Sequence, residues 1–258
     1  MLSTKLNSEL RSRNLQIVTA AQTVNFVDQA DEVSVVSWPK FMLYDEVANR
    51  HWVDLNKKFD NFQFALIEKD SKKWIAVGNS IPVFWPDALE ELPDKGWDWA
   101  LAFGMENDDV PNLLCALAIQ ILPEYRGKGL STLMVQIMKH IGHLEGFDQL
   151  IAPVRPNKKC DYPLLPMSSY LEWSRAEERF DPWVRVHERL GARLLKICPQ
   201  AMFISETLEA WTRWTGMSFQ NSGEYVVPGA LTTVTIDTEK NRGVYVEPNV
   251  WMVHTHKN

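Results

Sequence analysis

Residues 123 to 131 carry the residue types that bind an anion. The segment reads Pro-Glu-Tyr-Arg-Gly-Lys-Gly-Leu-Ser. Its two glycines let the backbone turn tightly and come close to a ligand. Because the residues that follow predict a helix, free N–H groups and the positive end of the helix dipole favour a phosphate here. Arg126 and Lys128 add positive charge. The segment therefore predicts a phosphate-binding turn.

A buried strand and an amphipathic helix must position this turn. Leu113–Leu122 is apolar except for Gln120, as is typical of a strand that is covered on both faces. Beyond the turn, apolar residues recur at three- and four-residue spacing, which predicts one buried face of a helix. These residues are Leu130, Leu133, Met134, Ile137, Ile141 and Leu144. The sequence thus predicts a strand, a turn and a helix across residues 113–145.

This strand–turn–helix resembles the acyl-CoA-binding segment of the GNAT superfamily of N-acetyltransferases. The family signature is Arg or Gln, two residues, Gly, one residue, and then Gly or Ala. Arg126 and Gly129 match the signature, whereas Ser131 replaces its last small residue. The departure is mild, because serine is also small and its hydroxyl can hydrogen-bond a phosphate.

The resemblance implies an α/β (α+β) fold, with a mixed, mostly antiparallel twisted sheet, a splayed central strand and flanking helices. It also implies that the donor is acetyl-CoA or another short acyl-CoA. The pantetheine arm would pair, like an added strand, with the backbone of Ile119, Gln120 and Ile121. The pyrophosphate would be held by the amides of Arg126, Gly127, Lys128, Gly129, Leu130 and Ser131.

A second family landmark, Tyr-Glu-Lys-x-Gly-Phe, is similar to residues 187–192, His-Glu-Arg-Leu-Gly-Ala. Gly191 aligns with the landmark glycine. His187 takes the place of the tyrosine that often protonates the departing thiolate, and Ala192 replaces the aromatic residue. Histidine can act as this acid because its pKa normally lies near neutrality. The alternative is that His187 only packs within its helix.

Two further family positions bear on the site. An asparagine commonly follows the next strand, here Gln149–Val154, and Asn157 is its candidate counterpart or an ordinary loop residue. The glutamate that serves as a base on the central strand is replaced by Cys115, whose apolar surroundings favour inert packing. The candidates that remain for the base are a chain of waters or the side chains of His51, Tyr44, Glu145 and Glu172.

The rest of the chain is organised around this core as one domain of 258 residues. It divides into the acyl-CoA-binding core 113–204, acceptor-side helices and strands 15–85, insertions 86–111 and 160–180, and an extended C-terminal region 205–258. Expected elements include strands at 15–19, 62–68, 74–85, 193–204, 224–234 and 243–254, and helices at 20–30, 38–59, 182–190 and 206–214. The second insertion would form a lid or a pocket rim.

Composition and net charge argue against some classes of function. The net charge of −6 argues against a nucleic-acid binder, and no apolar run reaches the roughly 20 residues of a membrane span. The three cysteines lack metal-ligand spacing, so we expect reduced thiols, no metal and a cytoplasmic setting. The 11 tryptophans suit either plain core packing or a wide cleft for a bulky or aromatic-apolar acceptor.

These features predict an acyltransferase that moves an acetyl or other short acyl group from CoA directly to an amine. Two alternatives stay open at this point. A non-catalytic acyl-CoA sensor is consistent with the altered catalytic positions, His187 and Cys115. An O-acyltransferase would need only a different acceptor pocket. The identity of the acceptor and the formation of a homodimer are likewise left open.

Overall fold

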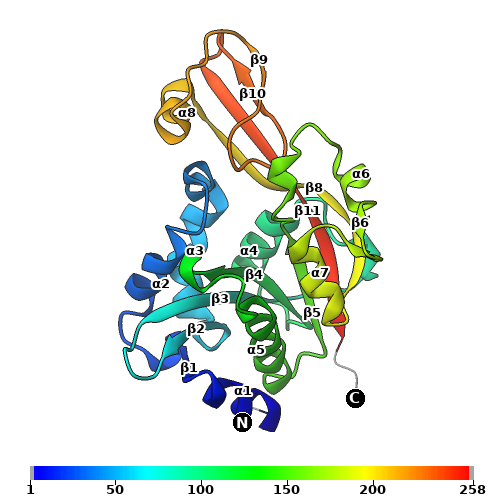
Figure 1. Cartoon of the computed structure of the whole chain (residues 1–258). Helices are drawn as coiled ribbons and strands as arrows, with labels where there is room; N and C mark the ends of the chain where they lie inside the picture. Colours follow the sequence, from blue (N-terminus) through cyan, green and yellow to red (C-terminus); the bar gives the residue numbers. More distant parts are fainter. Residues whose placement is uncertain (1–2, 256–258) are drawn as a thin grey trace.

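In this computed structural model, which describes residues 3–255, nine strands form a twisted sheet that places β4 beside β5 near its centre (Figure 1). The strand order is β1-β2-β3-β4-β5-β11-β10-β9, and β8 pairs with β11. The strands are β1 Leu15–Thr19, β2 Gln63–Glu68, β3 Trp74–Val83, β4 Leu113–Ile121, β5 Gln149–Val154, β8 Arg193–Thr207, β9 Gly223–Tyr225, β10 Val234–Asp237 and β11 Arg242–Thr255. A separate short hairpin consists of β6 Ser174–Arg175 and β7 Glu178–Arg179.

β4 and β5 are parallel, whereas every other strand pair in the described residues is antiparallel. They pair at only two positions, Leu114 with Leu150 and Cys115 with Ile151. Beyond Cys115 the two strands separate, while β4 continues along β3 as far as Ile121. The predicted mixed, mostly antiparallel sheet with a splayed central strand is therefore confirmed.

Helices cover both faces of the sheet (Figure 1). They are α1 Thr4–Ser12, α2 Phe26–Ser34, α3 Glu46–Lys58, α4 Gly96–Glu106, α5 Leu130–Leu144, α6 Met167–Leu171, α7 Pro182–Arg189 and α8 Leu208–Thr215. On one face, α1 and α5 share a core cluster, and α7 contacts α5. On the other face lie α3 and α4 in one cluster and α2 in another.

The long pair β8–β11 extends past the main sheet as an arm, seen at the top of Figure 1. Its inner half adjoins β5 through residues Val250–Thr255, and its outer half carries α8, β9 and β10. The arm returns to the N-terminal half through aromatic contacts of the 3-10 helix Lys40–Tyr44. Phe41 packs on Trp211 at 5.6 Å and Tyr44 stacks on Trp214 at 4.2 Å between ring centroids. The C-terminal region therefore completes the sheet and braces the opposite side of the molecule.

Several element boundaries differ from those expected. The helix predicted at 20–30 is a 3-10 turn, Ala20–Gln22, followed by α2. The strand predicted at 224–234 is mostly the loop that joins β9 to β10. The predicted insertion 86–111 contributes to the core, because Trp97, Ala100 and Leu101 of α4 are buried in the largest core cluster. The N-terminus of α7 agrees with prediction, since Asp181 accepts hydrogen bonds from its first-turn amides.

Tryptophan is mainly a core residue in this fold. None of the 11 tryptophans, all of which lie in the described range, is exposed. Trp211 and Trp251 are fully buried, and Trp97 and Trp214 nearly so. The high tryptophan content is therefore accounted for largely by packing in and against the core clusters.

Candidate active site

A β-bulge marks the point where β4 leaves β5. Asn79 and Ser80 are adjacent on β3, but they face Ala118 and Ala116 on β4, so Leu117 has no opposite residue. A bulge locally disrupts the ladder and bends its strand. The Leu117 carbonyl is held by Trp97, whose indole Nε1–H donates to it at 2.8 Å. Sequence patterning missed this feature, because a bulge is defined by the partner strand.

The glycine turn, residues 126–129, follows the end of β4, beyond the point where β4 and β5 separate and leave a fork between them. Gly127 and Gly129 have φ angles of 74° and 77°, a left-handed conformation that favours glycine. Gly129 is the residue before α5, and no side chain caps the helix N-terminus. The first-turn amides are thus available to an anion. A Cβ placed on Gly127 would meet no atom within 4 Å, so the space above the turn is open.

Basic side chains surround the turn. Arg126 is exposed, and its Nε–H donates to the Ile121 carbonyl at 3.1 Å, which ties the turn to the end of β4. The ammonium groups of Lys73 and Lys128 lie 5.1 and 4.9 Å from the Tyr125 ring centroid. Lys73 is also paired with Glu124, at 2.8 Å, so the positive charge beside the predicted phosphate turn comes chiefly from Arg126 and Lys128. The role of the turn in holding CoA stays a proposal.

Arg13, which follows α1, is a further cation at this turn. Its Nη1–H donates to the Lys128 carbonyl at 2.8 Å, and its Nη2 would lie 3.5 Å from a Cβ on Gly129. Glu9 holds the same guanidinium in an ion pair of 3.1 Å. Sequence reasoning missed Arg13 because it lies 115 residues from Lys128.

Replacing Arg13 by alanine is expected to weaken acetyl-CoA binding by about tenfold, since one charge-assisted contact to a phosphate would be lost. Titration calorimetry measures the change. Arg11→Ala is the matched control, because Arg11 is an exposed arginine at the end of the same helix. Equal affinities of the two variants would contradict a role for Arg13 in binding.

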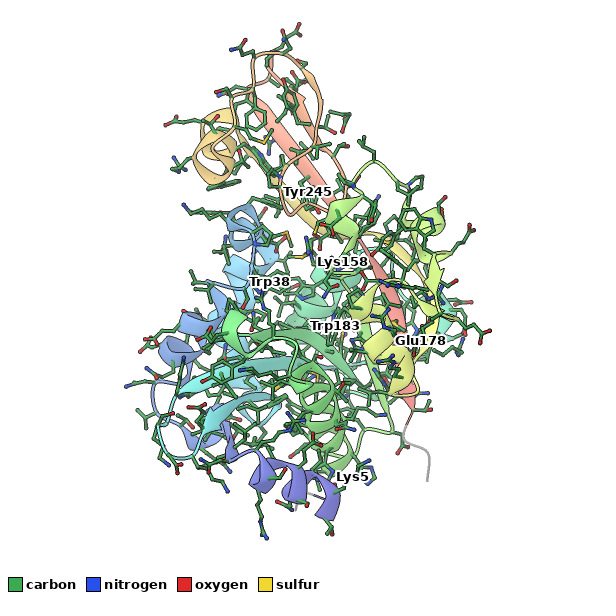
Figure 2. All side chains as sticks on the ribbon, in the orientation of Figure 1. Lys5, Trp38, Lys158, Glu178, Trp183 and Tyr245 are labelled. Carbon is green, nitrogen blue, oxygen red and sulfur yellow. The ribbon has the colours of Figure 1, made fainter. Side chains whose placement is uncertain are left out.

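His187, the predicted acid, lies on α7 and is only 2% exposed. Its Nδ1 is 2.8 Å from Nε2 of His254 on β11, and the Trp183 ring, labelled in Figure 2, packs against it at 4.4 Å. Its Nε2 has no hydrogen-bond partner among the described residues. Burial, and then the charge on His254, hold the pKa of His187 well below its usual value.

This environment corrects the expected pKa of His187. The imidazole is neutral at pH 7, because transfer from water into a buried site disfavours the charged form. An imidazolium titrating near neutrality is therefore the wrong description of this group. If His254 donates to Nδ1, the proton of His187 is on Nε2, the nitrogen that has no protein partner. A neutral N–H donor at that position is still able to stabilise a thiolate.

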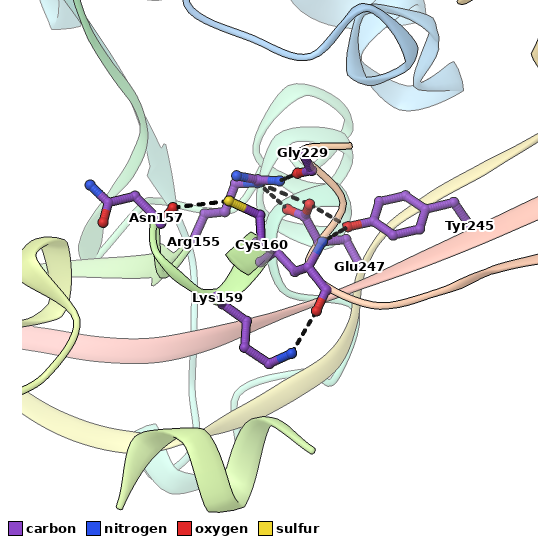
Figure 3. A network of polar contacts seen from close by, with 8 residues as sticks. Arg155, Asn157, Lys159, Cys160, Gly229, Tyr245 and Glu247 are labelled. Atoms are coloured by element: carbon purple, nitrogen blue, oxygen red, sulfur yellow. Dashed lines mark hydrogen bonds and ion pairs between the residues drawn. The ribbon is translucent and has the colours of Figure 1, made fainter. Parts of the chain in front are cut away.

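Beyond β5, Arg155 joins the sheet to the C-terminal arm (Figure 3). Its Nε lies 3.0 and 2.9 Å from the two carboxylate oxygens of buried Glu247, and its Nη2–H donates to the Gly229 carbonyl at 2.7 Å. The Tyr245 hydroxyl also donates to Glu247, at 2.8 Å. Asn157, the candidate counterpart of the family asparagine, is exposed two residues further along. These hydrogen bonds hold the backbone that leads to Asn157.

The candidate bases lie in different places. His51 lies on α3, and its Nε2 is 3.2 Å from a carboxylate oxygen of Glu106. Tyr44 stacks on Trp214 of α8. Glu172 is exposed after α6, and Glu145 follows α5 at the end opposite the glycine turn, about 22 Å away along the helix. The side chain that acts as the general base is therefore left unassigned.

Cys115 has the environment of a core residue. Cys115 is fully buried in the core, and burial raises the pKa of its thiol well above the usual value, so the expectation of inert packing is confirmed. Within residues 3–255, no group of three His, Cys, Asp or Glu side chains is arranged to hold a metal ion. None of the helices described is long and apolar enough to cross a membrane.

The fork, the bulge and the glycine turn before α5 define a GNAT-like fold, and solved structures agree. The loading GNATL domain of CurA from Lyngbya majuscula superposes with a TM-score of 0.61 at 18% identity, covering 94% of this chain and 96% of that one. The GNAT-like decarboxylase GphF, in complex with isobutyryl-CoA, gives 0.58 at 11% identity, covering 93% and 98%. At these identities the likeness concerns the fold alone.

A sequence relative identifies the family. Arginine N-acetyltransferase avaD of Aspergillus versicolor is 32% identical over 247 residues, with 84% of each chain covered. No protein-family model matches the chain. The chain belongs to the GNAT superfamily of N-acetyltransferases. It is accordingly a CoA-dependent N-acetyltransferase that acts on an amine, as the sequence predicted, rather than a non-catalytic sensor.

Proposed function

We propose that this enzyme transfers the acetyl group of acetyl-CoA to an amino group of arginine or of a similar small cationic amine. The fork between β4 and β5 at the Leu117 bulge supports acetyl-CoA as the donor. The arginine N-acetyltransferase relative supports the acceptor half, and the net charge of −6 favours a cationic substrate. A bulky aromatic acceptor has less support, because the tryptophans are accounted for by core packing.

The proposed reaction takes place at the fork. The CoA phosphates bind the amides of residues 126–131, and the pantetheine arm runs along Ile119–Ile121. Backbone amides at the Leu117 bulge polarise the thioester carbonyl. The neutral amine attacks the carbonyl carbon, the C–S bond breaks, and the His187 Nε2–H donates a hydrogen bond to the departing sulfur. The proton lost by the amine passes to solvent, and CoA leaves as a thiolate that takes up a proton from solvent.

The other site residues fit this scheme. Asn157 is exposed in the loop after β5, which supports a contact between its side chain and the pantetheine arm. The three thiols are all unpaired by disulfides, which supports the cytoplasmic setting that we propose for the enzyme.

Thiol release from acetyl-CoA, measured across a panel of amines, tests the acceptor. We expect turnover with L-arginine, lower kcat/KM with agmatine if the carboxylate is recognised, and the lowest value with citrulline, which replaces the cation by a neutral urea group. Each assay is paired with calorimetry of CoA binding. Preference for an aromatic amine over arginine would contradict the proposed acceptor. Tight CoA binding without turnover on any amine would contradict the proposed reaction.

A further inference from the structure

A polar strip divides the buried surface under α2, α3 and α4. The apolar cluster under α3 and α4 contains Leu117, and the one under α2 contains Val77. Between them, neighbouring strands present Gln63, Asn79 and Gln120 on this same face. Their placement follows from the register, because Asn79 is two residues from Val77, Gln63 faces Asn79, and Gln120 faces Val77. All three amides are almost completely buried, at 0%, 2% and 4% exposure.

Hydrogen bonds from Gln63 fix the orientation of Asn79. The Gln63 Nε2 group donates to the carbonyls of Phe59 and Ser80, at 2.9 and 2.8 Å. The Gln63 Oε1 atom is thus left to accept a hydrogen bond, and it does so from Asn79 Nδ2 at 3.1 Å. Asn79 Oδ1 must then point the other way, where it has no partner among the described residues.

Gln120 provides a second oxygen without a partner, Oε1. It is a diagonal neighbour of Asn79, which faces Ala118 on β4. Such neighbours have Cα atoms roughly 7–8 Å apart, within reach of long side chains. Ala118 between them is small and belongs to neither apolar cluster. Because buried amide oxygens are nearly always satisfied, this pair requires a hydrogen-bond donor from outside the protein.

The polar strip lies beside the bulge, where we propose that acetyl transfer takes place. Ala118, the partner of Asn79, directly follows Leu117 of the bulge. From the two unpartnered oxygens beside the bulge, we propose that Asn79 and Gln120 form the acceptor subsite and accept hydrogen bonds from its N–H groups. The inference rests on the proposed function and adds the residues that recognise the amine. A guanidinium or ammonium group, which carries only donors, has the matching chemistry.

Steady-state kinetics with both substrates varied test this subsite. Gln120→Leu and Asn79→Ala are expected to raise KM for L-arginine by about tenfold. For Asn79→Ala the KM for acetyl-CoA should stay within about twofold, because Asn79 lies on β3, outside the strand that we propose binds the pantetheine arm. Gln120→Glu supplies a carboxylate and should increase the preference for arginine over citrulline.

Ser80→Ala is the matched control. Ser80 follows Asn79 on β3 with its side chain on the opposite face, and its hydroxyl donates to the Phe62 carbonyl at 3.1 Å. The variant should lose stability without a change in KM for arginine. If Gln120→Leu and Asn79→Ala behave in the same way, the strip holds only structural water and the subsite is wrong. If the wild type uses another amine, the same comparison applies to it, whereas turnover of no amine would overturn the proposed function itself.

Discussion

Replacing His187 by alanine is expected to lower kcat for acetyl transfer by about 100-fold, the low end of the range for losing one hydrogen-bond donor to a group that develops negative charge. The affinity for acetyl-CoA should change little, because His187 touches neither the glycine turn nor Ile119–Ile121 in the proposed complex. Stopped-assay kinetics and calorimetry measure the two quantities. His187→Gln, which keeps an N–H donor, should recover part of kcat.

The pH profile distinguishes the neutral donor from a titrating acid. Burial holds the pKa of His187 well below its usual value, so the group does not change charge between pH 6 and 8. The wild-type kcat should therefore lack a falling limb attributable to His187 in that window. An acid with a pKa of about 6.5 would instead lose activity as the pH rises through that value. A falling limb that disappears in His187→Gln would contradict the neutral-donor description.

Asp98→Asn is expected to make the protein more stable above neutral pH. Burial raises the pKa of Asp98 on α4 to about 9, and the charges of Asp45 and Glu247 add to the effect. The pKa of Asp45, also buried, is raised as well, chiefly by burial. Neither Asp45 Oδ2 nor Asp98 Oδ1 has a hydrogen-bond partner among the described residues. This is expected if the two carboxyl groups share one proton.

The direction in which Asp98 changes stability with pH follows from the protons that the folded and unfolded states bind. With a raised folded-state pKa, the native protein retains a proton that the unfolded chain releases above about pH 4. The stabilisation from this group is complete at low pH and is lost as the pH rises towards 9. Asparagine at position 98 stays neutral at every pH, and its carbonyl can still accept from the Phe203 amide, which lies 3.0 Å from Asp98.

Thermal unfolding between pH 5 and pH 9 measures the effect. At pH 8 the free energy of unfolding of Asp98→Asn should exceed that of the wild type by about 1 kcal/mol or more, which is roughly 2–4 °C in Tm for a chain of this size. The difference should shrink at pH 5. Asp148→Asn, at an exposed site, controls for the lost charge. Parallel pH profiles for the wild type and Asp98→Asn would contradict the shared proton.

Local patterns in the sequence predicted the strand, the turn and the helix of the candidate site well. The apolar strand, the two glycines and the helical spacing from Leu130 are all contained within 33 consecutive residues, and α5 begins at that leucine. The cap at Asp181 is likewise a local signal. These elements depend on short-range backbone chemistry, which an isolated sequence displays directly.

The remaining parts depend on contacts between distant segments. His187 meets His254, 67 residues away, and this burial rather than the residue type sets its pKa. Arg13 reaches the glycine turn across 115 residues. The orientation of Asn79 depends on Gln63 across the β2–β3 pair. Such partnerships follow from strand order and register, which hydrophobic spacing along one segment does not specify.

A crystal structure of the enzyme with bound CoA tests the central claim most directly. We predict that the pyrophosphate contacts the backbone amides of residues 127–131 together with the Arg13 guanidinium. The pantetheine arm should lie between Ile119–Ile121 and β5, and its sulfur should come within hydrogen-bonding distance of His187 Nε2. A CoA molecule whose phosphates bind away from the Gly127–Gly129 turn, or whose arm lies outside the fork between β4 and β5, would contradict this account.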